Sequence, residues 1–360
     1  MRCGKRGVSL PLCWGTFARL SVMSGKDVLR NPLTGFSMLF MFATILVIYV
    51  SMWFSFTVLG PTPSAVVTSA GAPVMDALDS AGVALVDVGA EGRNAEITVH
   101  DGRVYVLLDA SNQPAWNPIW MGLRDAGFAA DAITVVDSDG DVKLDPLRAN
   151  LGVAAMLGIA SIAFIGTTVP LVAMRERGLL RLFGTTPLRS STFLLAQLPA
   201  RVLVAVVPIT LTVAIAVWQR YLDGLDVLGL GVTFLLGTAM LLSFGLLFAA
   251  RSRNAEATQQ SMAMLTIMLV FASGGLLPAS ILPAVIQIAM NCLPTTWLAT
   301  AASATLTGSE PFFPLTVLWA LMAVAAACAA GMAARLFEWD QSEPRRPKLT
   351  IRREKVQAQL

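Results

Sequence analysis

The sequence is poor in charged side chains and in residues that bind metals. Only 14% of its 360 residues are Asp, Glu, Lys or Arg, whereas a soluble domain carries about 25%. It has a single His, which excludes a multi-histidine metal site, and four Cys without zinc-like spacing, which are too few for a disulfide scaffold. We therefore expect neither a catalytic cluster nor a metal site in this chain.

Two features that would supply energy for transport are also missing. The pattern GxxxxGK[ST], whose backbone amides and lysine hold ATP phosphates, does not occur. The central parts of the apolar segments contain no Asp, Glu or Lys, the groups with which ion-coupled carriers bind protons or sodium inside a membrane. If the protein moves a solute uphill, the energy must therefore come from a partner.

Long apolar segments dominate the sequence instead. Hydrophobic residues make up 55% of the chain, and its mean hydropathy is +0.67. A helix needs roughly 20 apolar residues to cross the hydrocarbon core of a bilayer. The sequence accordingly predicts a polytopic α-helical membrane protein with six transmembrane helices, over Phe36–Leu59, Leu151–Met174, Val202–Trp218, Val227–Ala250, Met262–Leu277 and Pro314–Leu336.

The fifth of these segments is the shortest, and a start nearer Glu256 is an alternative. A broken apolar segment follows it over residues 278–300 and contains Pro278, Pro283 and Pro294. Because proline removes a backbone donor and ends helices, this segment is predicted to be re-entrant or interfacial and not a straight span.

Basic residues lie on one side of the predicted spans. They gather before the first span, after the second and fourth spans and in the tail, whereas the connection between the first two spans has thirteen acidic residues against five basic ones. Cytoplasmic loops of membrane proteins are enriched in Lys and Arg. The sequence therefore predicts a multi-pass plasma-membrane protein with both termini in the cytoplasm and residues 61–150 outside. No cleavable signal peptide is expected.

The acidic region 61–150 is predicted to be a small extracytoplasmic α+β domain. Its expected strands are rich in β-branched residues and lie over Val83–Val88, Glu96–Val99, Val104–Leu108 and Ile133–Val136, with helices over Pro73–Ala81 and Pro114–Ala126. The Asp residues between positions 137 and 145 do not predict a calcium loop, because Val142 and Arg148 stand where such a loop needs Gly and Glu. His100 is expected to lie in a hairpin turn, and this interpretation is preferred to a role in a proton relay.

The most unusual cytoplasmic segment, Met174 to Arg189, follows the second predicted span. Charged residues come directly after the span, a short amphipathic piece follows, and a Gly-Thr-Thr-Pro turn comes last. Such a piece lies at a membrane interface or inserts its apolar side into the groove of a partner. The alternative is that its Arg residues only fix the topology of the preceding span.

Four motifs resemble those of permease subunits of ABC type-2 exporters, the type V fold. Residues 175–189 resemble the family's cytoplasmic signature loop, in which a charged pair containing Glu precedes an apolar turn and a Pro. Residues 107–114 resemble an external Asp-Gly-Ser-Asn-Pro element with one substitution and one insertion. Residues 273–283 resemble an SG-x-x-x-P-x-x-x-x-P element, and residues 293–297 resemble an external Leu-Pro element with Trp297 in place of Tyr. The motifs follow one another along the chain in the order expected for the family, and together the resemblance covers nearly the whole chain.

The resemblance implies a permease that pairs with an identical or different second permease and binds a separate cytoplasmic P-loop ATPase. ATP and magnesium would bind to that ATPase, and this chain would bind no cofactor and no nucleic acid. The implied site residues form an ATPase-coupling set of Arg175, Glu176, Arg177, Arg181, Phe183 and Pro187, an elbow helix with Trp14, Phe17 and Arg19, and an outer gate with Gly274, Gly275, Pro278, Pro283, Pro294 and Trp297. The second and fifth spans would line the subunit interface and the translocation path.

The expected organisation has five parts. These are a cytoplasmic N-terminus with the elbow helix (1–33), transmembrane helix 1 (34–60), the extracytoplasmic domain (61–150), transmembrane helices 2–6 (151–336) with a coupling loop at 175–201 and a re-entrant external segment at 278–300, and a basic cytoplasmic tail (337–360).

The predicted function is ATP-driven export of a hydrophobic or amphipathic substrate, such as a drug, an antibiotic or a lipid-like molecule, in contact with membrane lipids. Apolar spans suit such a cargo, although they are expected for any cargo. The alternative is a membrane receptor or sensor that binds a ligand through the external domain. A membrane-embedded enzyme ranks last, because clusters of ionisable residues near the bilayer are missing.

Overall fold

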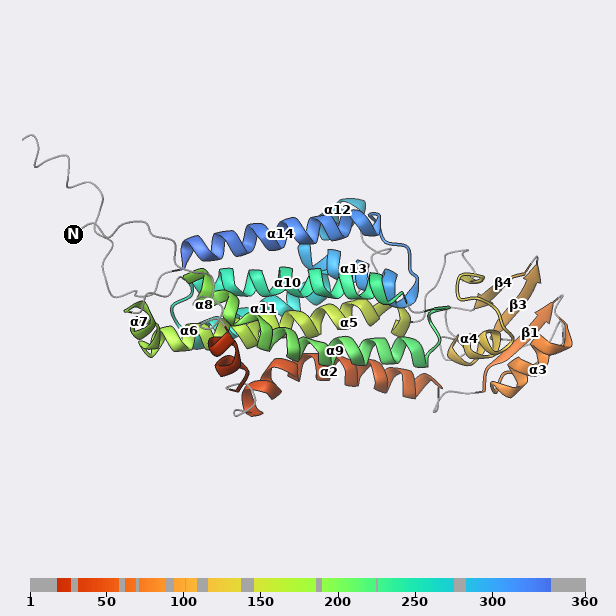
Figure 1. The fold of residues 1–360 in the computed structure, drawn as a ribbon. Coiled ribbons are helices and arrows are strands. Elements are labelled where there is room, and N and C mark those ends of the chain that lie inside the picture. Colours follow the sequence, from red (N-terminus) through yellow and green to blue (C-terminus); the bar gives the residue numbers. More distant parts are fainter. Residues whose placement is uncertain are drawn as a thin grey trace, which may run out of the picture.

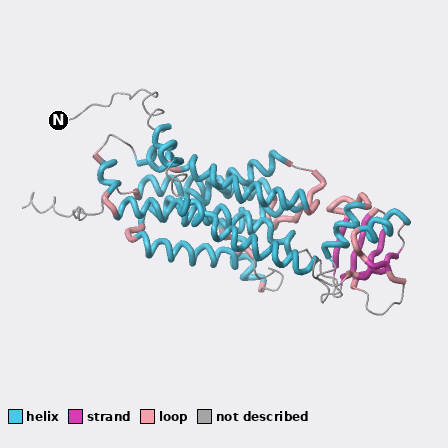
Figure 2. The backbone as a smooth tube through the Cα atoms, turned by 90° about the horizontal axis from the view of Figure 1, so that it is seen from below, coloured by secondary structure: helices cyan, strands magenta, loops and turns pink. Residues whose placement is uncertain are grey.

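The computed structural model contains a long bundle of helices and, at one end, a small α/β module (Figures 1 and 2). It describes residues 18–26, 32–57, 62–68, 71–87, 94–100, 102–108, 116–136, 146–185, 190–224, 226–274 and 283–337. We call the end of the bundle that carries the module the module end. The opposite end, where α7 (Leu179–Gly184) and α8 (Ser190–Ala196) lie, is the loop end.

Five helical stretches in the described residues are long and apolar enough to cross a membrane. They are Met38–Ser55, Leu147–Glu176, Ser191–Trp218, Val227–Arg251 and Leu315–Leu336. The helices that supply them are α2 (Pro32–Thr57), the unit formed by α5, η2 and α6, the pair α8 and α9 (Leu198–Trp218), α10 (Val227–Arg251) and α14 (Leu315–Leu336). They match the first, second, third, fourth and sixth predicted spans, which confirms a polytopic helical membrane protein.

The second span is one continuous helix at the centre of the bundle. It runs through α5 (Pro146–Ala163), a π-helical turn η2 (Phe164–Thr168) and α6 (Val169–Glu176). Every residue from 151 to 164 is buried within the chain, and α5 packs against α2, α9, α10 and α13 (Pro294–Thr307). The prediction that this span lines an interface between subunits is therefore wrong for its module-end half.

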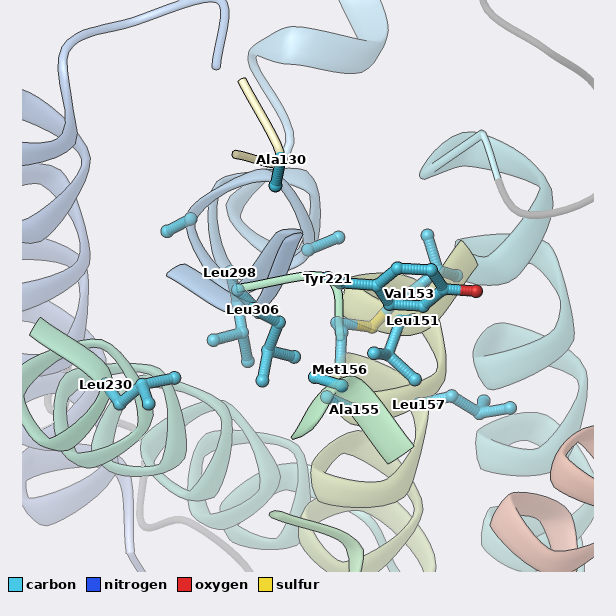
Figure 3. Close-up of a cluster of buried hydrophobic side chains, with 14 of the residues drawn as sticks. Ala130, Leu151, Val153, Ala155, Met156, Leu157, Tyr221, Leu230, Leu298 and Leu306 are labelled. Carbon is cyan, nitrogen blue, oxygen red and sulfur yellow. The ribbon is translucent and has the colours of Figure 1, made fainter. Parts of the chain in front are cut away.

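Helix α13 packs against α5 (Figure 3). Met156 of α5, Leu298 of α13 and Leu230 of α10 belong to one cluster of buried apolar side chains. A Cβ atom on Gly152 of α5 would collide with the backbone of Ala299 in α13. Glycine is therefore required here because the two helices approach each other closely.

The predicted fifth span has different limits. Helix α11 runs from Ala255 to Ala272, so it begins near the alternative start and ends five residues before Leu277. Its N-terminus is set by Asn254, whose side-chain oxygen accepts a hydrogen bond of 2.9 Å from the N–H of Ala257. With Glu and two Gln in its first turns, α11 does not belong to the five stretches that meet the length and hydropathy of a span.

The broken apolar segment after α11 contains two short helices, α12 (Ala284–Asn291) and α13. Pro283 precedes the first residue of α12, and Pro294 is the first residue of α13. Helix α13 continues to Thr307, beyond the predicted end of this segment at 300, and it is buried against α5, α10 and α14. Residues 283–307 therefore form two short helices and not one straight helix.

The module is a two-layer α/β unit. Its sheet has the strand order β2–β1–β3–β4–β5, in which only β3 and β4 pair antiparallel. The strands are β1 (Ser64–Thr68), β2 (Ala84–Leu85), β3 (Ala95–His100), β4 (Arg103–Leu108) and β5 (Ile133–Val136), and the helices α3 (Ala72–Ser80) and α4 (Trp116–Asp125). Alternate residues of β4 are buried and exposed, so one face of the sheet packs against the helices and the other is open.

Most of the predicted elements of the module are present, with two exceptions. The sequence interpretation missed β1, which lies between β2 and β3, and the predicted strand Val83–Val88 is reduced to the two residues of β2. His100 pairs with Arg103 across the β3–β4 hairpin, as predicted. The Asp-rich residues between 137 and 145 lie outside the described residues.

Candidate functional site

Arg175, the residue before the end of α6, turns its side chain into the bundle at the loop end. Its Nη1 donates hydrogen bonds of 2.6 Å to the carbonyl of Ala249 and 2.8 Å to that of Ser252. The guanidinium carbon lies 5.3 Å from the centre of the Phe337 ring. Because these carbonyls end α10, the buried cation stabilises the negative end of that helix dipole. Arg175 therefore contacts its own bundle through its guanidinium group.

Glu176 acts on the next helix. Its carboxylate accepts a hydrogen bond of 3.3 Å from the N–H of Ala255, the first residue of α11. An anion at a helix N-terminus is favoured by the helix dipole. Arg175 and Glu176, which are adjacent and of opposite charge, thus bond to the two ends of the short α10–α11 loop, residues 252–254.

The rest of the predicted coupling set follows in a turn and in α7. Arg177 is exposed, and Gly178 adopts a φ of +74°, which turns the chain away from α6. In α7, Leu180 is buried, whereas Leu179 is 42% and Leu182 is 67% exposed. Arg181 and Phe183 belong to α7, but their side chains, like Pro187 as a whole, lie outside the described residues.

A helix over residues 18–26 forms part of the predicted elbow. It packs against the junction of α8 and α9, where the hydroxyl of Ser24 donates a hydrogen bond of 2.9 Å to the side-chain oxygen of Gln197. The guanidinium of Arg201 bonds to both Ser24 and Gln197. Arg19 is exposed on this helix, and Trp14 and Phe17 lie outside the described residues.

The predicted outer-gate residues that the structure describes lie at or near the ends of three helices, α11, α12 and α13. Gly274 has a φ of +80° just after α11. Pro283 precedes the first residue of α12, and Pro294 is the first residue of α13. The indole N–H of Trp297 donates a hydrogen bond of 2.8 Å to the carbonyl of Asn291, which holds the two short helices together. Gly275 and Pro278 lie outside the described residues.

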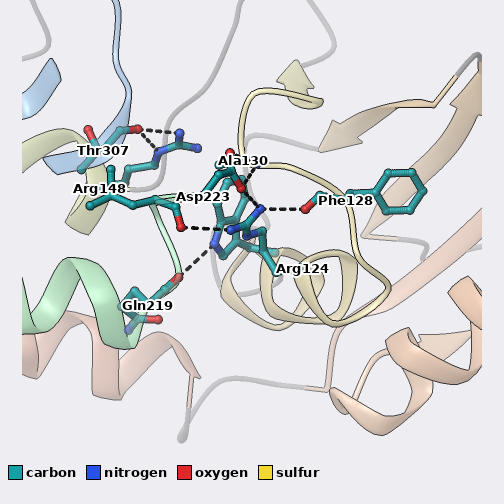
Figure 4. A network of polar contacts seen from close by, with 9 residues as sticks. Arg124, Phe128, Ala130, Arg148, Gln219, Asp223 and Thr307 are labelled. Atoms are coloured by element: carbon teal, nitrogen blue, oxygen red, sulfur yellow. Dashed lines mark hydrogen bonds and ion pairs between the residues drawn. The ribbon is translucent and has the colours of Figure 1, made fainter. Parts of the chain in front are cut away.

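The structure also reveals a polar network at the module end that the sequence interpretation missed (Figure 4). The indole N–H of Trp120 in α4 donates to the carbonyl of Gln219, 3.1 Å away, in the loop between α9 and α10. Arg124 forms an ion pair with Asp223 of the same loop. The N–H of Ala130 bonds to both carboxylate oxygens of Asp223, at 3.0 and 2.9 Å. Helix α4 and the residues after it therefore dock on the α9–α10 loop.

Asp223 is the titratable centre of this docking network. Burial by itself would raise the pKa of its carboxyl group. The N–H of Ala130, the bonded guanidinium of Arg124 and the charge of Arg148 oppose burial and hold the pKa below its ordinary value of 3.8. Asp223 is therefore ionised at neutral pH, and the network keeps its ion pair there.

A further polar contact lies at the end of the π-helical turn of the second span. Thr168, the last residue of η2, donates a hydrogen bond of 2.8 Å to the carbonyl of Gly245 in α10. A Cβ atom on Gly245 would collide with the carbonyl oxygen of Ala163. A π-helical turn is often found at functional positions in helices, and here it lies where α10 approaches the second span closely enough to require glycine at position 245.

The comparison with known families agrees with this arrangement. Residues 124–335 match the family model described as ABC-2 family transporter protein. The chain belongs to this family. No curated protein gives a significant match. The matched range begins at Arg124 and ends in the last turn of α14. It includes Arg124 and Asp223 of the docking network as well as Arg175 and Glu176, and it leaves α2, Trp120 and most of the module outside.

ABC-2 transporter proteins are the transmembrane components of ABC transporters and not their ATPases. The lack of a phosphate-binding loop in the sequence is consistent with that division. Membership of the family therefore implies an ATP-binding partner and, typically, a dimer of permeases.

Proposed function

We propose that this chain is the permease subunit of an ABC exporter, with the loop end docked on a separate cytoplasmic P-loop ATPase. The observation that carries the proposal is the arrangement of Arg175 and Glu176, which join the second span to both ends of the α10–α11 loop. A push on the segment just after them acts on three membrane helices at once.

The orientation follows from the distribution of charge. Four arginines lie at or near the ends of α6, α10 and α14 that contact one another at the loop end; they are Arg177, Arg251, Arg253 and Arg335. The acidic module is at the other end. The positive-inside rule supports an orientation with the loop end and both termini in the cytoplasm and the module outside. The proposed location is the plasma membrane.

Helix α7 offers the docking element for the ATPase. Leu179 and Leu182 are exposed at the loop end, while Leu180 anchors the helix in a cluster with Phe193 and Val172. An apolar ridge on a firmly anchored short helix suits insertion into a groove of a partner. In this proposal α7 contacts the ATPase, and Arg175 and Glu176 transmit its movement.

The outward face of α11 supports a second permease as the other partner. Gln259, Gln260 and Ser261 are exposed on this helix, and Met264 and Met268 continue the exposed face. Amide side chains inside a bilayer are unfavourable against lipid and are expected to face protein or an aqueous path. We therefore assign α11 as a further membrane-crossing helix, in addition to the five long apolar stretches. In this assignment it faces the second copy and the translocation path.

The substrate class is a hydrophobic or amphipathic molecule such as a drug, an antibiotic or a lipid-like compound. The exposed face of α11 combines two amides with methionine side chains, whose flexibility suits varied apolar ligands. In this proposal α12 and α13 form the outer gate, at the end of the path near the module.

The test is co-expression of the full chain with candidate P-loop ATPases, beginning with any that an adjacent coding region encodes. The expected result is co-purification and ATP hydrolysis in lipid vesicles that apolar substrates stimulate, with no hydrolysis by the permease alone. If no P-loop ATPase associates with the chain under any condition, the permease assignment is wrong and a receptor role takes its place. If hydrolysis occurs but apolar compounds leave it unchanged, the architecture stands and the substrate class is wrong.

A further inference from the structure

The C-terminal end of α13 is held by a buried arginine from the second span. Arg148, in the first turn of α5, donates hydrogen bonds of 3.2 Å through Nε and 2.7 Å through Nη2 to the carbonyl of Thr307. Thr307 is the last residue of α13, and Gly308 follows it with a φ of +65°. The guanidinium therefore bonds to a carbonyl at the negative end of the helix dipole, where a cation is favoured.

The same guanidinium also contacts the module. Its carbon lies 4.6 Å from the centre of the Trp120 ring in α4 and 5.9 Å from the centre of the Tyr221 ring in the α9–α10 loop. Arg148 is only 8% exposed, so these contacts are made away from water, where a cation over an aromatic face is most favourable. A planar guanidinium can stack and donate in its own plane at the same time, which an ammonium cannot do.

We propose that Arg148 is a positioning residue that ties the module to α13, so that the module and the outer gate move together. The inference rests on the proposed function only in calling α13 part of the gate. The polar contacts of α4 described above, from Trp120 and Arg124, are made with the α9–α10 loop. Arg148 connects α4 to a further element, because it also bonds to Thr307 of α13 (Figure 4). A shift of α13 at its C-terminal end draws the guanidinium away from Trp120, so α4 must follow or lose its stacking partner.

The apolar core supports a firm connection at this point. Trp120 of α4, Leu151 of α5, Tyr221 of the loop and Leu306 of α13 belong to a single cluster of buried side chains that continues from the sheet into the bundle. A side chain that joins packed elements on both sides transmits displacement, because packed interiors do not deform continuously.

The experiment is hydrogen exchange of the full-length permease in lipid nanodiscs, without the ATPase, for the wild type and three variants. In Arg148→Gln, exchange is expected to rise about tenfold both in residues 301–307 of α13 and in residues 116–123 of α4, because a charged hydrogen-bond donor is lost. Arg148→Lys retains a donor for Thr307 but no planar group, so α13 should recover more of its protection than α4. The matched control is Arg220→Gln, which removes an exposed ion pair between the loop and Asp125 without touching α13.

The outcomes separate a link from a general loss of stability. The proposal is supported if both segments change together in Arg148→Gln while residues 190–200 at the loop end and the whole Arg220→Gln protein behave as wild type. It is overturned if α13 keeps its wild-type exchange in Arg148→Gln, or if Arg220→Gln opens α13 as much. If Arg148→Gln fails to fold, Arg148→Lys decides alone: equal loss in both segments contradicts the role of the planar group. Because no ATPase is present, none of these results depends on the proposed function.

Discussion

Arg175 binds the carbonyl of Ala249 at a distance of 2.6 Å, although 74 positions separate the two residues along the chain. The contact joins the end of the second span to the end of α10. Glu176 makes the complementary contact with the start of α11. The two neighbouring side chains therefore stabilise opposite helix ends with opposite charges, and together they connect the segment before α7 to the helices proposed to form the path.

Replacing Arg175 should destabilise the loop end. Arg175→Gln removes a buried charged donor from the carbonyls of Ala249 and Ser252, a loss of about 2 kcal/mol, and should lower the apparent melting temperature in nanodiscs. Arg177→Gln is the control, since its exposed side chain predicts a change within about 0.5 kcal/mol. Equal effects of the two variants would refute the structural role of Arg175.

A methyl group on Gly245 should be far more harmful than one on Gly231 of the same helix. At Gly245 the new Cβ collides with the Ala163 carbonyl, whereas at Gly231 nothing lies within 4 Å. Gly245→Ala should therefore lose about 1–3 kcal/mol through overpacking, and Gly231→Ala should be neutral or slightly stabilising. Unfolding of both variants in the same mixed micelles measures the difference. A tolerated Gly245→Ala would mean that α5 and α10 are farther apart than the structure has them.

Docking of the module should weaken in acid. The pKa of Asp223 is lowered in the folded protein from its ordinary value of 3.8, so its contribution is complete above that value and is lost as the pH falls through the lower folded pKa. Hydrogen exchange of α4, corrected for the intrinsic rate, should be constant from neutral pH down to about 4 and should rise below that.

The control for this acid response is Asp223→Asn. It keeps an acceptor for the N–H of Ala130 but has no charge to pair with Arg124, so exchange of α4 should be faster than in the wild type and should not change with this titration. An acid response that persists in Asp223→Asn would assign it to another carboxyl group.

The positions of the spans were predictable because the bilayer sets their length and composition. The predicted fourth span, Val227–Ala250, differs from α10 by one residue. For the fifth span, the alternative start near Glu256 was close to the observed one, whereas the limits Met262–Leu277 were wrong. Hydropathy alone misses the polar first turns of α11, although Asn254 is a recognisable helix cap. Strand β1 was missed because its five residues, Ser-Ala-Val-Val-Thr, follow a proline-rich stretch that resembles a loop.

The contacts of Arg148 at the module end and of Arg175 and Glu176 at the loop end could not be predicted from local patterns. Arg148 and Thr307 are separated by 159 positions, and neither position carries a motif. In the sequence, Arg148 stands out only as the residue at the position where a calcium loop would need Glu. The sequence identified Arg175 and Glu176 as a charged pair after a span, but only the folded chain brings each to a different helix end.

A charge on the exposed ridge of α7 should separate the permease from its ATPase. Leu182→Asp replaces a side chain that is 67% exposed, so the permease should fold normally, and the loss of an apolar anchor should weaken binding about tenfold or more. Leu107→Asp is the matched control, because this leucine of β4 is 41% exposed in the module at the other end of the bundle. Pull-down of the ATPase from co-expressing cells, followed by titration of the purified subunits, measures the effect. Wild-type binding by Leu182→Asp would show that α7 does not dock on the ATPase, while loss of binding by both variants would point to misfolding in the membrane.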